Sequence, residues 1–295
     1  MATGTGAPVD CVWPAQARLG EGPIWDADAG LLHWIDIKAG RLHRFEPATG
    51  NRFSADVGEE IGAVALRASG GLIAVLRSGF ANLDMETGEK TPIIDPESDT
   101  AGNRFNDGAV DAAGRFWAGT MDDAEQDASG ALYRLDGDGR VTRLRDGFVI
   151  SNGIGWSPDG GTMYFTDSTR QRIVAYDFDP ASGDIGGDRT FVQLGDGGGF
   201  PDGLTVDAEG GVWSALWDGH RLMRFTPEGE LERSLPMPVP RPTSMAFGGD
   251  GLGTLYITSA RIGLDEGALS AAPLSGGLFA VDTGIKGLSE HRFRG

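Results

Sequence analysis

The chain has 295 residues, of which 40% are hydrophobic and 23% charged, which suits a compact soluble protein of one large domain or two ordinary ones. Its formal net charge of −18 would repel a nucleic-acid backbone or an anionic membrane surface, so we expect neither partner. The first residues, 1–8, lack a basic region followed by an apolar core, and no apolar run is long enough for a membrane span. We therefore expect a cytoplasmic protein. Cys11 is the single cysteine, which excludes an internal disulfide and a thiolate metal cluster.

A short motif recurs along the chain: a polar residue, then Gly, small or apolar residues, and Asp or Ser. Four clear copies and two weaker ones begin, in chain order, at Glu21, Ile61, Asp107, Asn152, Asp202 and Thr243, which we call the anchors. The intervals between successive anchors are 40, 46, 45, 50 and 41 residues. Such intervals are typical of four-stranded propeller blades.

Each anchor is followed by a Gly-containing turn and a second strand-like run, and then by a third. The second runs cover residues 31–35, 72–76, 115–118, 162–166, 211–215 and 254–258. The third runs cover residues 41–45, 80–84, 131–135, 172–178, 221–225 and 277–281. No segment longer than ten residues has helical periodicity with caps, so the pattern predicts an all-β chain.

We therefore predict a six-bladed β-propeller with four-stranded antiparallel blades around a central channel, as one domain over residues 1–295. Residues 1–12 are expected to form a partly flexible N-terminus or a closing strand. The run 9–13 is the candidate for an outer strand of the last blade, which residues 243–290 build, because ring closure removes exposed sheet edges.

The anchors are also candidate functional residues, because the first strand of each propeller blade lines the channel. Five of the six anchors carry a side-chain oxygen and three are carboxylates, which would repel one another in a partly desolvated channel. A bound cation would remove that repulsion. Asp and Asn before Gly are also common in turns, but this simpler explanation does not account for Glu21 or for the neighbours Arg104 and Asn106.

Five segments, taken together and in this order, resemble the SMP-30/gluconolactonase family, also called the regucalcin family, over residues 13 to about 290. They are Leu19-Gly20-Glu21-Gly22-Pro23-Ile24-Trp25, Asn103-Arg104-Phe105-Asn106-Asp107-Gly108, Phe116-Trp117-Ala118-Gly119-Thr120-Met121, Ile150-Ser151-Asn152-Gly153 and Phe200-Pro201-Asp202-Gly203-Leu204. The resemblance implies one divalent metal held by Glu21, Asn152 and Asp202, and a substrate gripped by Arg104 and Asn106.

Some members of the family use a further acidic residue on the loop after Gly-Thr-Met to contact substrate. Asp123 is the best match here, although Asp is one methylene shorter than the Glu that some members carry. Two carboxylates and one amide suit Ca²⁺, Zn²⁺, Mn²⁺ or Mg²⁺, with water completing the shell. Lactone hydrolysis needs a Lewis acid, an activated water and groups that orient the ring hydroxyls. We predict Asp202 as the general base, with Asp107 as the first alternative.

These observations predict a gluconolactonase-like hydrolase of carbohydrate metabolism that opens an aldono-1,4- or 1,5-lactone to the aldonic acid, as a monomer or weak homo-oligomer. Two other functions stay open: a metal-dependent propeller hydrolase of the arylesterase or phosphotriesterase type, and a non-catalytic calcium-binding propeller. Arg104 and Asn106 favour the lactonase, because a polyhydroxy substrate needs polar partners whereas an aryl ester pocket is chiefly apolar. The absence of Gly-x-Ser-x-Gly gives no support to an α/β-hydrolase nucleophile.

Overall fold

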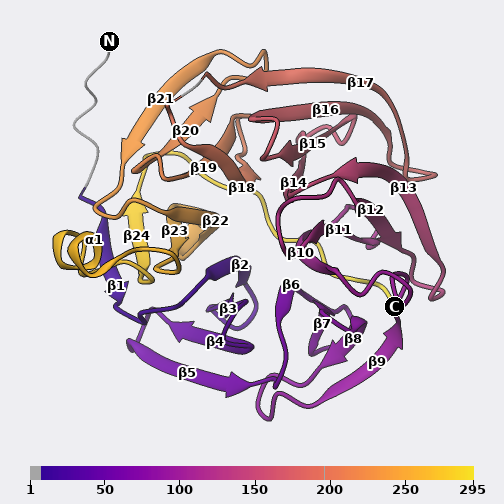
Figure 1. Cartoon of the computed structure of the whole chain (residues 1–295), viewed down its shortest axis with the longest axis horizontal. Helices are drawn as coiled ribbons and strands as arrows, with labels where there is room; N and C mark the ends of the chain where they lie inside the picture. The colour runs from indigo at the N-terminus through magenta and orange to yellow at the C-terminus, as the bar shows by residue number, and fades with distance from the viewer. Residues whose placement is uncertain (1–7, 196) are drawn as a thin grey trace.

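The computed structural model describes residues 8–195 and 197–295, and strands dominate it (Figure 1). Six four-stranded antiparallel sheets surround a central channel, so the chain is a six-bladed β-propeller as the repeat predicted. Within these residues the helical elements are α1 (Glu266–Ala271) and a single 3₁₀ turn, η1 (Asp250–Leu252). No helix in this part of the chain is long and apolar enough to cross a membrane.

The blades follow one another along the chain, and each blade is described from its innermost strand outward. Blade 1 contains β2 (Gly20–Asp26), β3 (Leu31–Asp36), β4 (Arg41–Glu46) and β5 (Asn51–Asp56); blade 2 contains β6 (Ile61–Leu66), β7 (Leu72–Leu76), β8 (Gly79–Leu83) and β9 (Lys90–Ile94); blade 3 contains β10 (Asn103–Val110), β11 (Phe116–Asp122), β12 (Gly130–Leu135) and β13 (Val141–Phe148). The predicted second and third runs of these blades coincide with the second and third strands to within a few residues.

The second half of the chain repeats the arrangement. Blade 4 contains β14 (Ser151–Trp156), β15 (Thr162–Asp167), β16 (Arg172–Asp179) and β17 (Asp184–Gln193); blade 5 contains β18 (Phe200–Val206), β19 (Val212–Trp217), β20 (Arg221–Phe225) and β21 (Leu231–Pro236); blade 6 contains β22 (Pro242–Gly248), β23 (Thr254–Ser259), β24 (Leu278–Asp282) and β1 (Asp10–Trp13). The predicted closing strand is therefore present: β1 pairs antiparallel with β24 and completes blade 6 from the other end of the chain. Residues 1–7 of the expected flexible N-terminus lie outside the described residues.

Each innermost strand has a register shift at its anchor. The shifts lie between Glu21 and Ile24, Ile61 and Ala63, Phe105 and Asp107, Asn152 and Ile154, Pro201 and Leu204, and Pro242 and Met245. A bulge of this kind redirects side chains within a strand. At some anchors the following glycine is needed because neighbouring innermost strands approach closely: a Cβ on Gly153 would lie 2.5 Å from the Leu204 nitrogen of the next blade. The repeated motif thus marks a strand bulge and not a turn.

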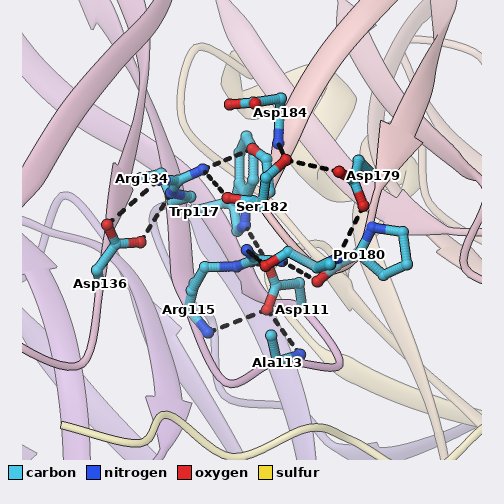
Figure 2. Close-up of polar contacts among 12 residues, drawn as sticks. Asp111, Ala113, Arg115, Trp117, Arg134, Asp136, Asp179, Pro180, Ser182 and Asp184 are labelled. Carbon is cyan, nitrogen blue, oxygen red and sulfur yellow. Dashed lines mark hydrogen bonds and ion pairs between the residues drawn. The ribbon is translucent and has the colours of Figure 1, made fainter.

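Adjacent blades are joined by apolar clusters and by hydrogen bonds from buried side chains. Trp34, Trp117 and Trp213 are fully buried in the second strands of blades 1, 3 and 5. Between blades 3 and 4, the Asp111 carboxylate accepts hydrogen bonds from Arg115 Nε at 2.6 Å and Trp117 Nε1 at 2.8 Å, and Arg115 Nη2 donates to the Pro180 carbonyl of blade 4 at 2.9 Å (Figure 2). These contacts fix the angle between the two blades.

Candidate active site

A cavity of about 310 Å³ lies at the end of the channel where the innermost strands begin. Its polar lining includes five of the six site residues predicted from the sequence: Glu21, Arg104, Asn106, Asn152 and Asp202. Each of them lies within the first four residues of its innermost strand, so the propeller brings four blades together at one point. The apolar part of the lining is made by Leu19, Met121, Ile150, Phe200, Pro201 and Trp217.

Two buried carboxylates, Glu21 and Asp202, line the cavity, and the half-buried carboxylate of Asp107 lies near them. Each accepts a hydrogen bond from the backbone N–H of the glycine that follows it. No Lys or Arg of residues 8–195 or 197–295 forms a salt bridge with any of the three. Their negative charges are therefore poorly compensated, and buried charges in proteins are normally paired or bind metal ions.

The electrostatic consequence is a set of raised pKa values. Burial raises the pKa of Glu21 well above its usual value, and the neighbouring Asp202 and Asp107 carboxylates raise it further. Burial likewise raises the pKa of Asp202 well above its usual range, with the Asp107 carboxylate adding to the effect. Burial raises the pKa of Asp107 to about 7. A cation at this point would favour the ionised form of all three groups.

A chain of hydrogen bonds crosses the cavity wall and orients the amide side chains. Arg104 Nη1 donates to Asn106 Oδ1 at 2.7 Å, and Asn106 Nδ2 donates to Asn152 Oδ1 at 2.8 Å. Asn152 Nδ2 then donates to Ser168 Oγ at 2.9 Å, and Ser168 Oγ donates to the Pro201 carbonyl at 2.6 Å. Because a guanidinium only donates, Asn106 must turn its oxygen toward Arg104, and this fixes the direction of every later bond. Asn152 Oδ1 keeps a second lone pair for another partner.

The donor set fits a divalent cation. Glu21 and Asp202 supply two negative charges, and Asn152 supplies a neutral oxygen whose orientation is fixed. No cluster of three or more His, Cys, Asp or Glu side chains in the described ranges is arranged to hold a metal ion, so a cation here would need the Asn152 oxygen or water as further ligands. Asp107 does not line this cavity; it lines a second cavity of about 450 Å³, which residues 288–291 help to enclose.

Asp123 is the one predicted site residue that is not part of the cavity lining. Its Oδ1 accepts from Lys38 Nζ at 2.7 Å and from Arg104 Nε at 2.9 Å, and its Oδ2 accepts from Arg77 Nη1 at 3.1 Å and Nη2 at 3.2 Å. Burial opposes ionisation of this carboxyl, but the hydrogen bond and charge of Lys38, with Arg77 and Arg104, lower its pKa to about 2.

Three further polar residues line the cavity that were not predicted from the sequence, Glu125, Ser168 and Thr169. Asp122 accepts hydrogen bonds from the backbone N–H of Gln126 at 2.8 Å and of Asp127 at 2.9 Å, and Glu125 takes a φ of 58° within the turn that results. The acidic side chain that this loop brings to the cavity is therefore that of Glu125. An Asp followed by a short polar stretch is a turn signal that could have indicated this reversal.

The sequence model described as SMP-30/Gluconolactonase/LRE-like region matches residues 19–261. The chain belongs to this family. A 6-deoxy-6-sulfogluconolactonase of Pseudomonas putida is 38% identical over 97% of the chain and 98% of its own length, and a pentonolactonase of Haloferax volcanii is 36% identical over 93% and 94%. Among solved structures, a calcium-binding protein, regucalcin, from Agrobacterium tumefaciens is 31% identical with a TM-score of 0.95, covering 100% of both chains. Lactone hydrolysis is thus found within the family to which this chain belongs.

Proposed function

We propose that this chain is a divalent-metal-dependent lactonase that hydrolyses a small aldonolactone to the aldonic acid. The observation that carries the proposal is the placement of Glu21 and Asp202, buried without cationic partners among the described residues, beside the guanidinium and amide groups of Arg104 and Asn106 in one cavity. The lactonases among the relatives support the same reaction class.

Glu21, Asn152 and Asp202 would hold the metal, because they combine two charges with one oriented neutral oxygen. When bound, the metal supplies Lewis acidity to the lactone carbonyl and to the attacking water. The apolar side chains of Leu19, Phe200 and Trp217 restrict solvent around these groups, which strengthens the electrostatic interactions in the cavity.

The hydrogen bonds of Arg104 determine which of its atoms remain for the substrate. Its Nε donates to Asp123, and its Nη1 donates to the Phe105 carbonyl at 3.1 Å and to Asn106 Oδ1. The two N–H groups of Nη2 are left to bind ring oxygens or the oxyanion that develops at the carbonyl. Asn106 uses both of its N–H groups on Ser151 and Asn152, so it offers a substrate hydroxyl only the second lone pair of its oxygen.

The proposed hydrolysis requires one proton transfer at each end of the reacting ester. Asp202 takes a proton from the attacking water as the new C–O bond forms at the carbonyl carbon. The ring C–O bond then breaks, and its oxygen takes up the proton from Asp202 to become a hydroxyl of the open acid, which returns Asp202 to its ionised form. Glu125, on the loop over the cavity, is in place to accept hydrogen bonds from substrate hydroxyls.

A pH-stat assay tests the proposal, because each lactone opened releases one carboxylic acid. Metal-free protein is assayed with Ca²⁺, Zn²⁺, Mn²⁺ and Mg²⁺ in turn on a panel of aldono-1,4- and 1,5-lactones, with aryl esters as comparison substrates. We expect cation-dependent opening of at least one aldonolactone. Cation binding without turnover would instead indicate a calcium-binding propeller, and turnover confined to aryl esters would indicate an arylesterase.

A further inference from the structure

We propose that Asp123 is a positioning residue: it holds the guanidinium of Arg104 in place and makes no contact with substrate. The inference deepens the proposed function and rests on it. It follows from a cluster of five charged side chains beside the cavity, Lys38, Glu60, Arg77, Arg104 and Asp123, which we call the clamp. Its members are joined by five salt bridges of 2.7–3.1 Å between carboxylate oxygens and side-chain nitrogens.

The acceptor capacity of Asp123 is full. A carboxylate offers about four lone-pair sites, and Asp123 receives hydrogen bonds from Lys38 Nζ, Arg104 Nε, Arg77 Nη1 and Arg77 Nη2. A substrate hydroxyl could bind this carboxylate only by displacing a cation. Asp123 therefore has no free acceptor for the lactone, in contrast to Glu125, whose side chain lines the cavity.

The clamp also explains how Arg104 is kept in the cavity wall. The side chain of Arg104 is only 4% exposed, and an unpaired buried charge would be strongly destabilising. Asp123 compensates this charge through Nε, so that Nη2 stays available. With three cations and two anions the clamp keeps a net charge of +1, which suits an oxyanion in the cavity.

Three blades contribute residues to the clamp, so its salt bridges depend on how these blades are placed relative to one another. Lys38 lies between β3 and β4 of blade 1, Arg77 directly follows β7 of blade 2, and Asp123 directly follows β11 of blade 3. Glu60, just before β6, accepts from Lys38 Nζ at 2.9 Å and Arg77 Nη1 at 2.8 Å and so fixes the two cations that hold Asp123. Lys38 and Arg77 thus position Asp123, which in turn positions Arg104.

A double-mutant cycle tests the inference. Wild type, Asp123→Asn, Arg104→Lys and the double variant are compared by kcat/KM on the best aldonolactone at saturating metal. We expect Asp123→Asn to lose about tenfold to 10²-fold, the size of effect that misplacing a catalytic group can have. In the Arg104→Lys background the same change should cost less than about twofold, because Asp123 acts through Arg104. Losses that multiply would show an independent substrate contact and overturn the inference.

Two further variants calibrate the cycle. Asp127→Asn removes the same charge from an exposed position on the same loop and should leave kcat/KM unchanged. Lys38→Met removes a donor to Asp123 from another blade and should lower kcat/KM in the same direction as Asp123→Asn but less. If Asp123→Asn does not fold, Lys38→Met and Arg77→Met replace it in the cycle.

A second measurement separates the inference from the proposed function. The ¹⁵N-labelled Nε–Hε signal of Arg104, assigned by its loss in Arg104→Lys, should be protected from solvent exchange in wild type and should lose that protection in Asp123→Asn. Unchanged protection would overturn the clamp whether or not the protein is a lactonase. If wild type opens no aldonolactone while the signal behaves as expected, the proposed function fails and the clamp stands.

Discussion

Asp107 and Asp111 of blade 3 lie four residues apart, but the fold gives their carboxylates very different partners. Asp111 is fully buried and accepts hydrogen bonds from the backbone N–H of Ala113 and of Arg115, both at 3.0 Å, as well as from the Arg115 and Trp117 side chains (Figure 2). Asp107 has the N–H of Gly108 and no salt bridge within the described part of the chain, and burial raises its pKa to about 7.

Blade 5 repeats this contrast. Asp202 lies in the cavity with a raised pKa, while Asp207, five residues later and fully buried, accepts from Trp213 Nε1 at 2.8 Å and Arg224 Nε at 2.7 Å. The acids at the far end of the innermost strands are thus compensated by the protein itself, and they hold strands and blades together. The acids at the near end form no salt bridge among the described residues, and their pKa values are raised, which is an environment typical of functional carboxylates.

The largest expected effect comes from Asp202→Asn, which keeps the side-chain shape but removes the charge and the proton acceptor. Lactonase activity should fall about 10²- to 10⁴-fold. Stability of the metal-free protein should stay equal or rise, because a repelling buried charge is lost. Activity comes from the pH-stat assay and stability from urea unfolding. Activity within threefold of wild type would move the base to Asp107.

Asp111→Asn should lower the stability of the protein and leave its activity nearly unchanged, the reverse of Asp202→Asn. Removing one partner of a buried ion pair leaves Arg115 uncompensated and typically costs about 3–5 kcal/mol of stability. Urea unfolding monitored by tryptophan fluorescence measures the loss, and kcat below the transition should stay within a few-fold of wild type. A variant as stable as wild type would show that the contacts of Asp111 do not hold the blades.

A divalent cation should stabilise the folded protein only by binding at the carboxylates near the start of the innermost strands, Glu21 and Asp202. At 100 times its Kd, one bound cation adds about 2.7 kcal/mol, which thermal unfolding detects as a shift of several degrees. Titration calorimetry should give about one cation per chain. Glu21→Gln should lose most of this shift, and Asp127→Asn, the surface control, should keep it. An equal shift in both variants would place the cation elsewhere.

The smallest effect concerns Asp123, an acid whose partners lower its pKa to about 2. Because the folded pKa lies below the unfolded value of about 3.9, its ionised form stabilises the fold above pH 4 and that contribution is lost as the pH falls toward 2. The stability difference between wild type and Asp123→Asn should therefore shrink over this range. Side-chain exposure of 26% keeps the difference modest. Thermal unfolding across a pH series measures it, and a constant difference would contradict the ion pairs.

The sequence by itself determined the architecture, because the repeat interval, the strand runs and the anchor motif all depend on local pattern. It also predicted the anchors at one depth, since residues at equivalent repeat positions occupy equivalent places in a closed ring, and Glu21, Asn152 and Asp202 line one cavity while Asp107 lines another. The resemblance then selected Arg104 and Asn106, and the propeller puts both in the same cavity.

Only the tertiary structure decided how the charges pair. Asp123 and Glu125 stand two residues apart on one acidic loop, and no local pattern shows that the first is surrounded by cations from blades 1, 2 and 3 while the second faces the cavity. Likewise, no local pattern shows that the carboxylate of Asp111 is compensated by side-chain partners and that of Asp107 is not. Whether a buried carboxylate is compensated depends on side chains that are remote in sequence, such as Lys38 for Asp123. Such contacts arise only when the blades close into a ring.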